Sequence, residues 1–214
     1  MQRSAILAAL LKTKIIAIIR LSNAAQVYPT ANALLKGEVN AVEVTMGTPN
    51  AIEEIRKLAE LPNILLGVGS VVNPKTVNEA AEAGAQYIVT PVSKKEVIEE
   101  AHRLGKPIFS GALTPKEVLQ AYEWGADVVK LFPAETFGLS YFKAIRAPMP
   151  YIPMMPTGGV SIENAAEWLK NGAVCLGVGS ALINKQLIED KDFERITELA
   201  KNMRNEVDKI EDAI

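Results

Sequence analysis

The sequence contains a single cysteine, Cys175, and a single histidine, His102. One cysteine cannot form an intrachain disulfide and indicates a reducing compartment, so we expect a cytoplasmic protein. One histidine excludes a histidine-rich metal site, and it excludes a Ser-His-Asp triad built on any other histidine. We expect no metal, and we interpret Cys175 as a buried hydrophobic residue and His102 as a solvated residue on a polar helix.

The chain also lacks a basic stripe and a long apolar run. Its net charge is -2, so neither nucleic acid nor a membrane is an expected partner. The apolar run 5–11 follows Arg3 as in a signal peptide, but Lys12 and Lys14 come at once after it without a small-residue cleavage site. The next run, 15–19, is too short to cross a bilayer. A short helix followed by a buried strand is therefore predicted here.

Apolar residues make up 49% of the 214 residues, which is enough for one large core. This length lies within the range of a single α/β barrel. The sequence shows no linker, low-complexity tract or break in composition, so one domain spanning 1–214 is predicted.

A strand-helix unit recurs along the chain. Gly84, Gly125 and Gly172 each follow a predicted helix and precede alanine and an apolar segment, and Gly37 and Gly105 hold the same place before two other segments. Glycine is the expected residue just past a helix end, because it adopts positive φ without a Cβ penalty.

The expected starts of the helices carry capping signals. Thr48-Pro49, Asn73-Pro74 and Thr114-Pro115 each place a capping residue before a proline. Ser93 with Glu96 and Thr114 with Glu117 have the spacing of a capping box, and Ser161 is expected to cap another helix.

Eight strands are predicted between these signals. They lie near 14–20, 40–45, 63–68, 86–90, 107–110, 127–132, 151–156 and 173–178. Most are continuous apolar runs, as in a parallel sheet that is covered on both faces. The pattern predicts a single-domain (β/α)₈ TIM barrel with a short N-terminal helix, and a doubly wound open sheet is the alternative.

In such a barrel the functional groups lie at the carboxyl ends of the strands. The polar residues predicted there are Arg20, Glu43, Thr45, Ser70, Thr90, Lys130, Thr157 and Ser180. Lys130 is notable because its neighbours are apolar, and lysine is rarely buried unless paired. Desolvation turns lysine into an amine nucleophile, and a carboxylate such as Glu43 can serve as general acid and base. A snorkelling lysine or an internal ion pair between the two is the structural alternative.

Two glycine motifs, 156–160 and 177–180, follow the seventh and eighth predicted strands. Barrels often bind phosphate with these two loops through backbone N–H groups, although ordinary tight turns would look the same. The similar segment 67–70 closes the third strand and could hold a carboxylate.

Four segments together resemble the bacterial KDPG/KHG aldolases, which cleave 2-keto-3-deoxy-6-phosphogluconate and in many cases 4-hydroxy-2-oxoglutarate. The segments are Glu43-Val44-Thr45, the stretch 130–135 (KLFPAE), Pro156-Thr157-Gly158-Gly159, and Gly177-Val178-Gly179-Ser180. The resemblance runs from about the first strand to the last helix. It implies a class I lyase of carbohydrate metabolism, in the Entner–Doudoroff route, that needs no cofactor and acts as a homotrimer on a small 2-keto acid.

The resemblance also implies a role for each matching position. Lys130 matches the Schiff-base lysine, Glu43 the general acid/base, and Thr157 a threonine that affects stereochemical choice. The other positions match residues that bind substrate (Arg20, Thr45, Ser70, Pro91, Phe132) or phosphate (Gly158, Gly159, Gly179, Ser180).

One position departs from the family pattern. Many members carry an arginine that contacts the substrate carboxylate where this sequence has Gly47. We hypothesise that Arg20 supplies the missing charge. The preferred keto acid therefore stays open. Three alternatives also stay open. They are turnover of the galactonate-derived epimer, a sugar-phosphate isomerase or epimerase with Glu43 as base, and a non-catalytic sugar-phosphate-binding barrel.

Overall fold

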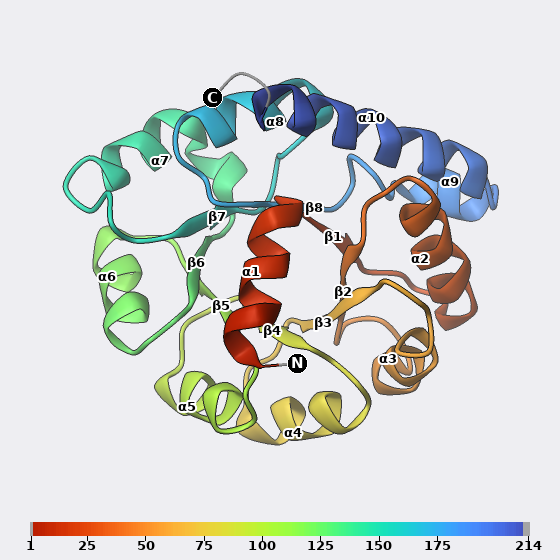
Figure 1. Ribbon diagram of the computed structural model, residues 1–214, viewed down its shortest axis with the longest axis horizontal. Helices are drawn as coiled ribbons and strands as arrows, with labels where there is room; N and C mark the ends of the chain where they lie inside the picture. Colours follow the sequence, from red (N-terminus) through yellow and green to blue (C-terminus); the bar gives the residue numbers. More distant parts are fainter. Residues whose placement is uncertain (1, 212–214) are drawn as a thin grey trace.

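A computed structural model describes residues 2–211 of the chain (Figure 1). The predicted domain 1–214 thus extends slightly outside the described residues. The eight strands are β1 (Ile15–Ile19), β2 (Ala41–Thr45), β3 (Leu65–Gly69), β4 (Tyr87–Val89), β5 (Ile108–Ala112), β6 (Val128–Leu131), β7 (Met154–Pro156) and β8 (Leu176–Val178). Each predicted strand is present within a few residues of its expected bounds.

All strand pairs are parallel, in the order β7-β6-β5-β4-β3-β2-β1-β8. A parallel bridge between Thr157 and Gly177, and a hydrogen bond from Val174 N to Met154 O at 3.0 Å, join the two end strands. The sheet is thereby closed, so the predicted (β/α)₈ barrel is confirmed over an open sheet.

Helices form a ring around the barrel (Figure 1). They are α2 (Val27–Lys36), α3 (Ala51–Leu58), α4 (Pro74–Glu82), α5 (Lys95–Arg103), α6 (Pro115–Glu123), α7 (Gly138–Arg146), α8 (Ile162–Lys170), α9 (Lys185–Glu189) and α10 (Phe193–Glu211), with 3₁₀ turns at Ala24–Gln26 and Ala134–Thr136. Within the part that the structure describes, no helix is both long and apolar enough to cross a membrane.

Three of the predicted helix starts are confirmed. Asn73 Oδ1 accepts from Thr76 N at 2.9 Å at the start of α4. Thr114 and Glu117 form the predicted capping box of α6, and Ser161 precedes α8, where its N–H donates to Asn164 at 2.9 Å.

Two predicted caps are wrong. Helix α3 begins at Ala51 after Asn50, and the Thr48 hydroxyl accepts instead from Leu21 N at 3.3 Å. Helix α5 begins at Lys95, and the Ser93 hydroxyl donates to Gly111 O at 2.9 Å. In both cases a partner from a neighbouring strand or loop competes with the local helix N–H groups for the same hydroxyl.

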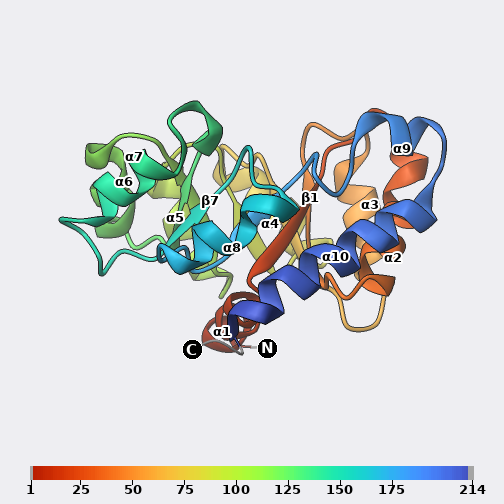
Figure 2. The ribbon, with the colours of Figure 1, turned by 90° about the horizontal axis from the view of Figure 1, so that it is seen from above.

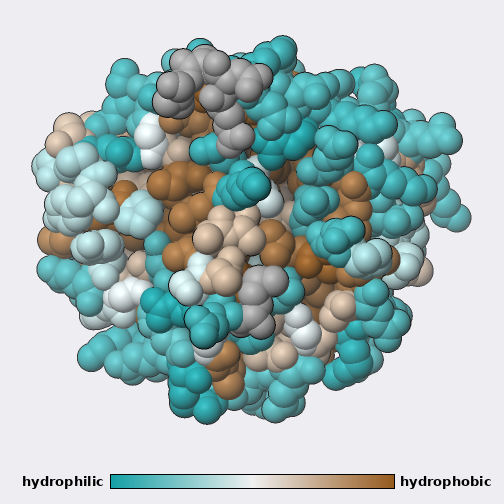
Figure 3. Space-filling model, viewed as in Figure 1, coloured by the Kyte–Doolittle hydropathy of each residue, from teal (hydrophilic) through white to brown (hydrophobic). Residues whose placement is uncertain are grey.

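The predicted N-terminal helix is α1 (Arg3–Thr13), and it closes one end of the barrel. Figure 2 shows it beneath the strands, at the end where they begin. Ile6 and Leu10 are buried there with apolar residues from seven strands or their ends, among them Tyr87 and Phe109. Figure 3 views this end, where hydrophobic surface gathers around the centre and hydrophilic residues cover the outer ring. Any ligand site in the barrel must therefore open at the opposite end.

The interpretation of His102 as a solvated residue is wrong. Its Nε2 lies 3.1 Å from Asp127 Oδ2, and only 24% of the side chain is exposed. Asp127 is nearly buried and also accepts from Arg3 at 2.9 Å, so the cluster ties α5 and α1 to the start of β6. A buried carboxylate needs such partners, and the sequence pattern of the helix did not reveal them.

The expectation that Cys175 is a buried hydrophobic residue holds. Cys175 is fully buried, which raises the pKa of its thiol. Trp168 is buried as well, and Trp124 packs partly buried against the core. Helix α10 buries one face and exposes a charged one.

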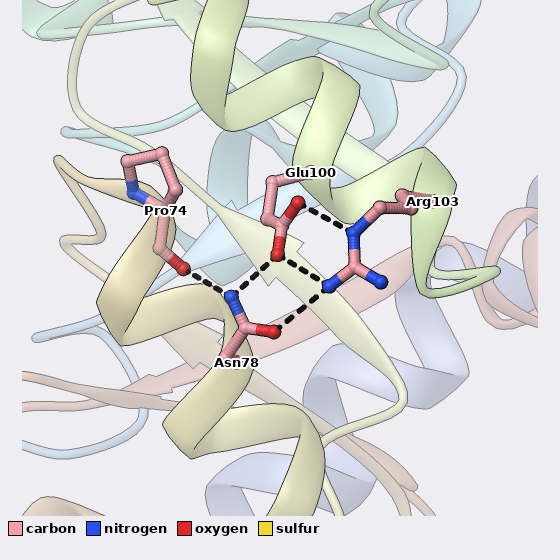
Figure 4. A network of polar contacts seen from close by, with 4 residues as sticks. All are labelled: Pro74, Asn78, Glu100 and Arg103. Atoms are coloured by element: carbon pink, nitrogen blue, oxygen red, sulfur yellow. Dashed lines mark hydrogen bonds and ion pairs between the residues drawn. The ribbon is translucent and has the colours of Figure 1, made fainter.

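Polar contacts also join neighbouring helices of the ring. Between α4 and α5, Asn78 and Arg103 both donate to Glu100 (Figure 4). These hydrogen bonds lower the pKa of Glu100 to about 2.

Candidate active site

The alternation of side chains along the strands decides which residues face the barrel interior. Ala41 (β2), Val128 (β6) and Met155 (β7) belong to the apolar layer above α1. Residues two positions further along a strand point the same way, one layer closer to the carboxyl end. These residues are Glu43, Lys130 and Thr157. The predicted acid, amine and hydroxyl therefore meet in one layer, although they are far apart in the sequence.

Glycines leave the space that this layer needs. A Cβ added to Gly69 would overlap the Glu43 carboxyl group, and one added to Gly177 would overlap the Thr157 hydroxyl. On β5, a Cβ on Gly111 would overlap the backbone of Pro91. The segments 67–70 and 177–180 were predicted as ligand-binding loops or as tight turns, and nothing in the sequence pattern indicated that glycine here admits a neighbouring functional side chain.

Glu43 is 1% exposed. Burial raises the pKa of its carboxyl group, while the positive charges of Lys130 and Arg20 act in the opposite direction. Within residues 2–211, its Oε2 atom has no hydrogen-bond partner. A carboxyl group in such surroundings can take up and release a proton closer to neutral pH than an exposed one.

Lys130 is 6% exposed, and its Nζ atom lies 5.1 Å from the centre of the Phe132 ring. It forms no ion pair with an acid among the residues that the structure describes. The structural alternative of an internal ion pair with Glu43 is therefore not what the structure shows. Lys130 influences Glu43 through its charge, and its amine stays available to a third group.

A pocket of about 330 Å³ opens next to this layer. It contains seven of the predicted site residues: Arg20, Phe132, Thr157, Gly158, Gly159, Gly179 and Ser180. Gly158 and Gly159 have φ of 100° and 70°, which only glycine adopts readily. Their backbone and that of the 177–180 segment form a glycine-lined wall suited to an anion.

The same pocket contains Glu135, which was not predicted as a site residue. Its carboxylate lies against the backbone of the Gly158–Gly159 turn. Its place in the segment 130–135 was the one signal that could have indicated it. A carboxylate beside an anion-binding wall restricts which anions fit there.

The remaining predicted residues lie outside this pocket. Pro91 lines a second pocket of about 230 Å³ next to β5, and Phe132 is shared by the two. Thr45 is fully buried, with a hydroxyl that has no partner in the described part of the chain. Ser70 directly follows β3 with φ of 61°. Glu43 and Lys130 also do not line the 330 Å³ pocket, although Thr157 of the same layer does.

No three acidic, histidine or cysteine side chains among residues 2–211 are grouped so as to hold a metal ion. The site is thus defined by an amine, a carboxyl group, hydroxyl groups and a glycine-lined anion pocket. These are groups for covalent catalysis and for acid–base catalysis.

The relatives of this chain are aldolases. The KHG/KDPG aldolase of Escherichia coli (strain K12) is 35% identical over 176 residues, which are 81% of this chain and 82% of that one. The 2-dehydro-3-deoxy-phosphogluconate aldolase of Pseudomonas aeruginosa is 33% identical over 193 residues, covering 89% and 87%. The structure of a KDPG aldolase from Legionella pneumophila with pyruvate captured as a covalent carbinolamine matches with a TM-score of 0.85 and 29% identity, covering 95% and 98%.

A barrel with these groups at its open end is a lyase of the aldolase class. The family model of KDPG and KHG aldolase matches residues 6–199, and the chain belongs to this family.

Gly69→Ala tests whether glycine is needed to seat Glu43. The new methyl group would displace the flexible Glu43 side chain, so we expect a stable fold and a loss of kcat of about 100-fold or more. Steady-state kinetics and thermal unfolding measure the two effects separately.

Gly37→Ala is the matched control. There the methyl group would overlap the backbone of α10, outside the barrel, so stability should fall while kcat per folded molecule is kept. Wild-type kcat in a folded Gly69→Ala variant would show that Glu43 does not depend on this space.

Proposed function

We propose that this aldolase is a class I enzyme that forms a Schiff base at Lys130 and cleaves 2-keto-3-deoxy-6-phosphogluconate to pyruvate and glyceraldehyde 3-phosphate. The observation that carries the proposal is the buried, unpaired Lys130 amine in one layer with the buried Glu43 carboxyl group. The names of the relatives supply the substrate.

The first step is addition of the Lys130 Nζ atom to the keto carbon of the substrate. Loss of water from the carbinolamine gives an iminium ion. The carbinolamine captured in the Legionella enzyme is the corresponding intermediate in a relative. The iminium ion accepts the electron pair of the C3–C4 bond, so no metal is required to hold this charge.

Glu43 moves the protons. Its carboxylate takes the proton of the C4 hydroxyl group through a water as the C3–C4 bond breaks, and the aldehyde leaves. The same group then returns a proton to C3 of the enamine, and hydrolysis of the new iminium releases pyruvate and restores the Lys130 amine. Burial raises the pKa of Glu43, and the charges of Lys130 and Arg20 lower it. This balance allows the group both to accept and to donate a proton.

The substrate phosphate is proposed to bind at the glycine-lined wall of the 330 Å³ pocket, at Gly158, Gly159, Gly179 and Ser180. Support comes from the positive φ of two of these glycines and from the frequent use of the loops after the last two strands for phosphate. Phe132 and Pro91 are proposed as walls on the side of the second pocket.

The pyruvate half is proposed to bind deeper, where Thr45 and Thr157 present buried hydroxyl groups with no partner among the described residues. Ser70 completes this region from the end of β3. Arg20 is proposed to bind the substrate carboxylate in place of the family arginine, because Gly47 has no side chain to do so and Arg20 is close enough to lower the pKa of Glu43.

A second proposed substrate is 4-hydroxy-2-oxoglutarate, which yields pyruvate and glyoxylate. This addition is supported by the name of the Escherichia coli relative. The galactonate-derived epimer differs in stereochemistry alone, and Thr157 is the proposed residue that distinguishes it. Membership of an aldolase family favours these reactions over isomerase or epimerase chemistry and over a non-catalytic binding barrel.

Borohydride reduction in the presence of pyruvate tests the Schiff base. We expect a stable adduct on the peptide that contains Lys130, detected by peptide mass mapping, and activity that chelators leave unchanged.

Lys130→Met should abolish both adduct and turnover, whereas Glu43→Gln should still form the adduct while turnover falls by about 100-fold or more. An adduct elsewhere, or activity lost to chelators, contradicts the mechanism.

Arg20→Met tests the carboxylate anchor. Loss of a charged hydrogen bond should weaken binding of pyruvate, measured as a product inhibitor, by about tenfold or more, and Arg20→Lys should recover part of it. Pyruvate has no phosphate, so it separates the two anion sites. If only glyceraldehyde 3-phosphate binds more weakly, Arg20 belongs to the phosphate pocket that it lines.

A homotrimeric assembly in the cytoplasm, serving the Entner–Doudoroff route, is proposed as well. Support comes from apolar side chains left exposed beyond the carboxyl ends of the strands: Val92 after β4 and Phe137 after β6 are each 51% exposed. Light scattering is expected to give about three times the chain mass of 23.1 kDa. A monomer at micromolar concentration would exclude the trimer.

A further inference from the structure

Tyr87, the first residue of β4, carries a hydroxyl group that its packing does not use. The residue is fully buried, and its ring packs edge-on against Phe109 with 5.9 Å between ring centres. Within residues 2–211 the hydroxyl oxygen has no hydrogen-bond partner. A phenylalanine would fill the same space without burying an unpaired polar group, so the hydroxyl calls for another explanation.

The ring of Tyr87 lies across β3 toward β2. A Cβ on Gly67 would overlap the Cε2 and Cζ atoms of Tyr87, so the hydroxyl-bearing end of the ring lies over Gly67. Gly67 pairs with Tyr87 on one side and with Glu43 on the other. The ring therefore extends from its own strand over the central one, in the direction of Glu43.

The Glu43 carboxyl group lies over the same strand, two residues further on. Its Cγ, Cδ and Oε1 atoms occupy the space that a Cβ on Gly69 would fill. Inward-facing positions two apart on a strand are separated by roughly 6.6 Å. The Tyr87 hydroxyl and the Glu43 carboxyl group are thus neighbours over β3, without a direct hydrogen bond.

Glu43 Oε2 is the second unpartnered polar atom of this pair. One ordered water can join two buried polar groups when it lies within hydrogen-bond distance of both, donating to one and accepting from the other. Among the described residues of the apolar cluster below Glu43, Tyr87 is the one that carries a hydroxyl group.

We propose that the Tyr87 hydroxyl is a positioning group for Glu43, donating through one bridging water to its carboxylate. In this role it fixes the direction of the carboxylate and favours its ionised form. The inference rests on the proposed function, in which Glu43 transfers the protons.

The charged and titratable groups around the pair are consistent with this role. Lys130 on β6 and Arg20 after β1 face Glu43, and Cys175, just before β8, faces Tyr87. Burial and the nearby negative charge of Glu43 hold the pKa of Tyr87 well above its usual value, so the hydroxyl keeps its proton. Burial also raises the pKa of the Cys175 thiol, which leaves it neutral. Tyr87 is therefore a permanent donor at neutral pH.

Tyr87→Phe removes only the hydroxyl oxygen. We expect kcat to fall roughly three- to tenfold with KM nearly unchanged. A donor to the carboxylate lowers the pKa of Glu43, so its removal raises that pKa, and the acid limb of the pH profile of kcat/KM should move to higher pH. A variant that keeps the wild-type kcat and acid limb would reduce Tyr87 to a packing residue and overturn the proposal.

Tyr141→Phe on α7 is the matched control. Its hydroxyl donates to Leu113 O at 3.0 Å, outside the barrel, so this variant should lose stability without a shift of the acid limb. A fluorinated tyrosine placed at position 87 is a stronger donor of nearly the same size, and it should move the acid limb to lower pH. An unchanged limb in that protein also overturns the proposal, even if Tyr87→Phe folds poorly.

Borohydride trapping with pyruvate separates this inference from the function on which it rests. Tyr87→Phe should still give the adduct on Lys130, because the hydroxyl acts through Glu43 alone. If the wild-type protein forms no adduct, the proposed function fails. If both proteins form the adduct but their pH profiles coincide, the proposed role of Tyr87 is refuted and the proposed function is not affected.

Discussion

The structure depends on one constraint: an amine and a carboxyl group are buried in the same layer of a barrel without forming an ion pair with each other. Lys130 and Glu43 lie on strands on opposite sides of the barrel, each one layer above the cluster that packs on α1. A direct ion pair would satisfy both groups and leave neither free to react. Their separation keeps the charge of one within reach of the other while a substrate can enter between them.

The remainder of the interior can be understood from this constraint. Glycines on the intervening strands create the volume that the functional side chains occupy, so the layer is filled by a few polar groups that cross over neighbouring strands. The apolar layer beneath it is filled by large side chains such as Phe109. The same β-strand alternation thus produces a rigid floor and a reactive layer directly above it.

The sequence predicted the barrel well because its signals are local and repeated. Apolar runs, terminal glycines and the starts at Asn73, Thr114 and Ser161 each depend on residues within one turn or one strand. The prediction failed where a side chain had a distant partner, as for Thr48 with Leu21, Ser93 with Gly111, and His102 with Asp127. Nothing in the local pattern distinguishes a hydroxyl that caps a helix from one that binds the next strand.

The candidate site likewise contains residues that the local sequence indicates and residues that only their distant neighbours reveal. Lys130 and Glu43 could be chosen from the sequence because a charged residue in an apolar strand end is conspicuous. Tyr87 and Glu135 could not, because a tyrosine in a buried strand and an acid in a loop are both ordinary. Their significance comes from what lies beside them: an unpaired carboxyl group in one case and the Gly158–Gly159 turn in the other.

Helix α1 has a consequence for how molecules enter and leave the barrel. Because Ile6 and Leu10 seal the end where the strands begin, reactants and products share a single mouth. In the proposed reaction the keto-acid half is held at the bottom of this blind channel and the phosphorylated half near its entrance. The aldehyde departs first because the pyruvate half is still bound covalently to Lys130, and both products then leave through the same mouth. A helix that touches no reacting atom thereby confines entry and exit to one opening.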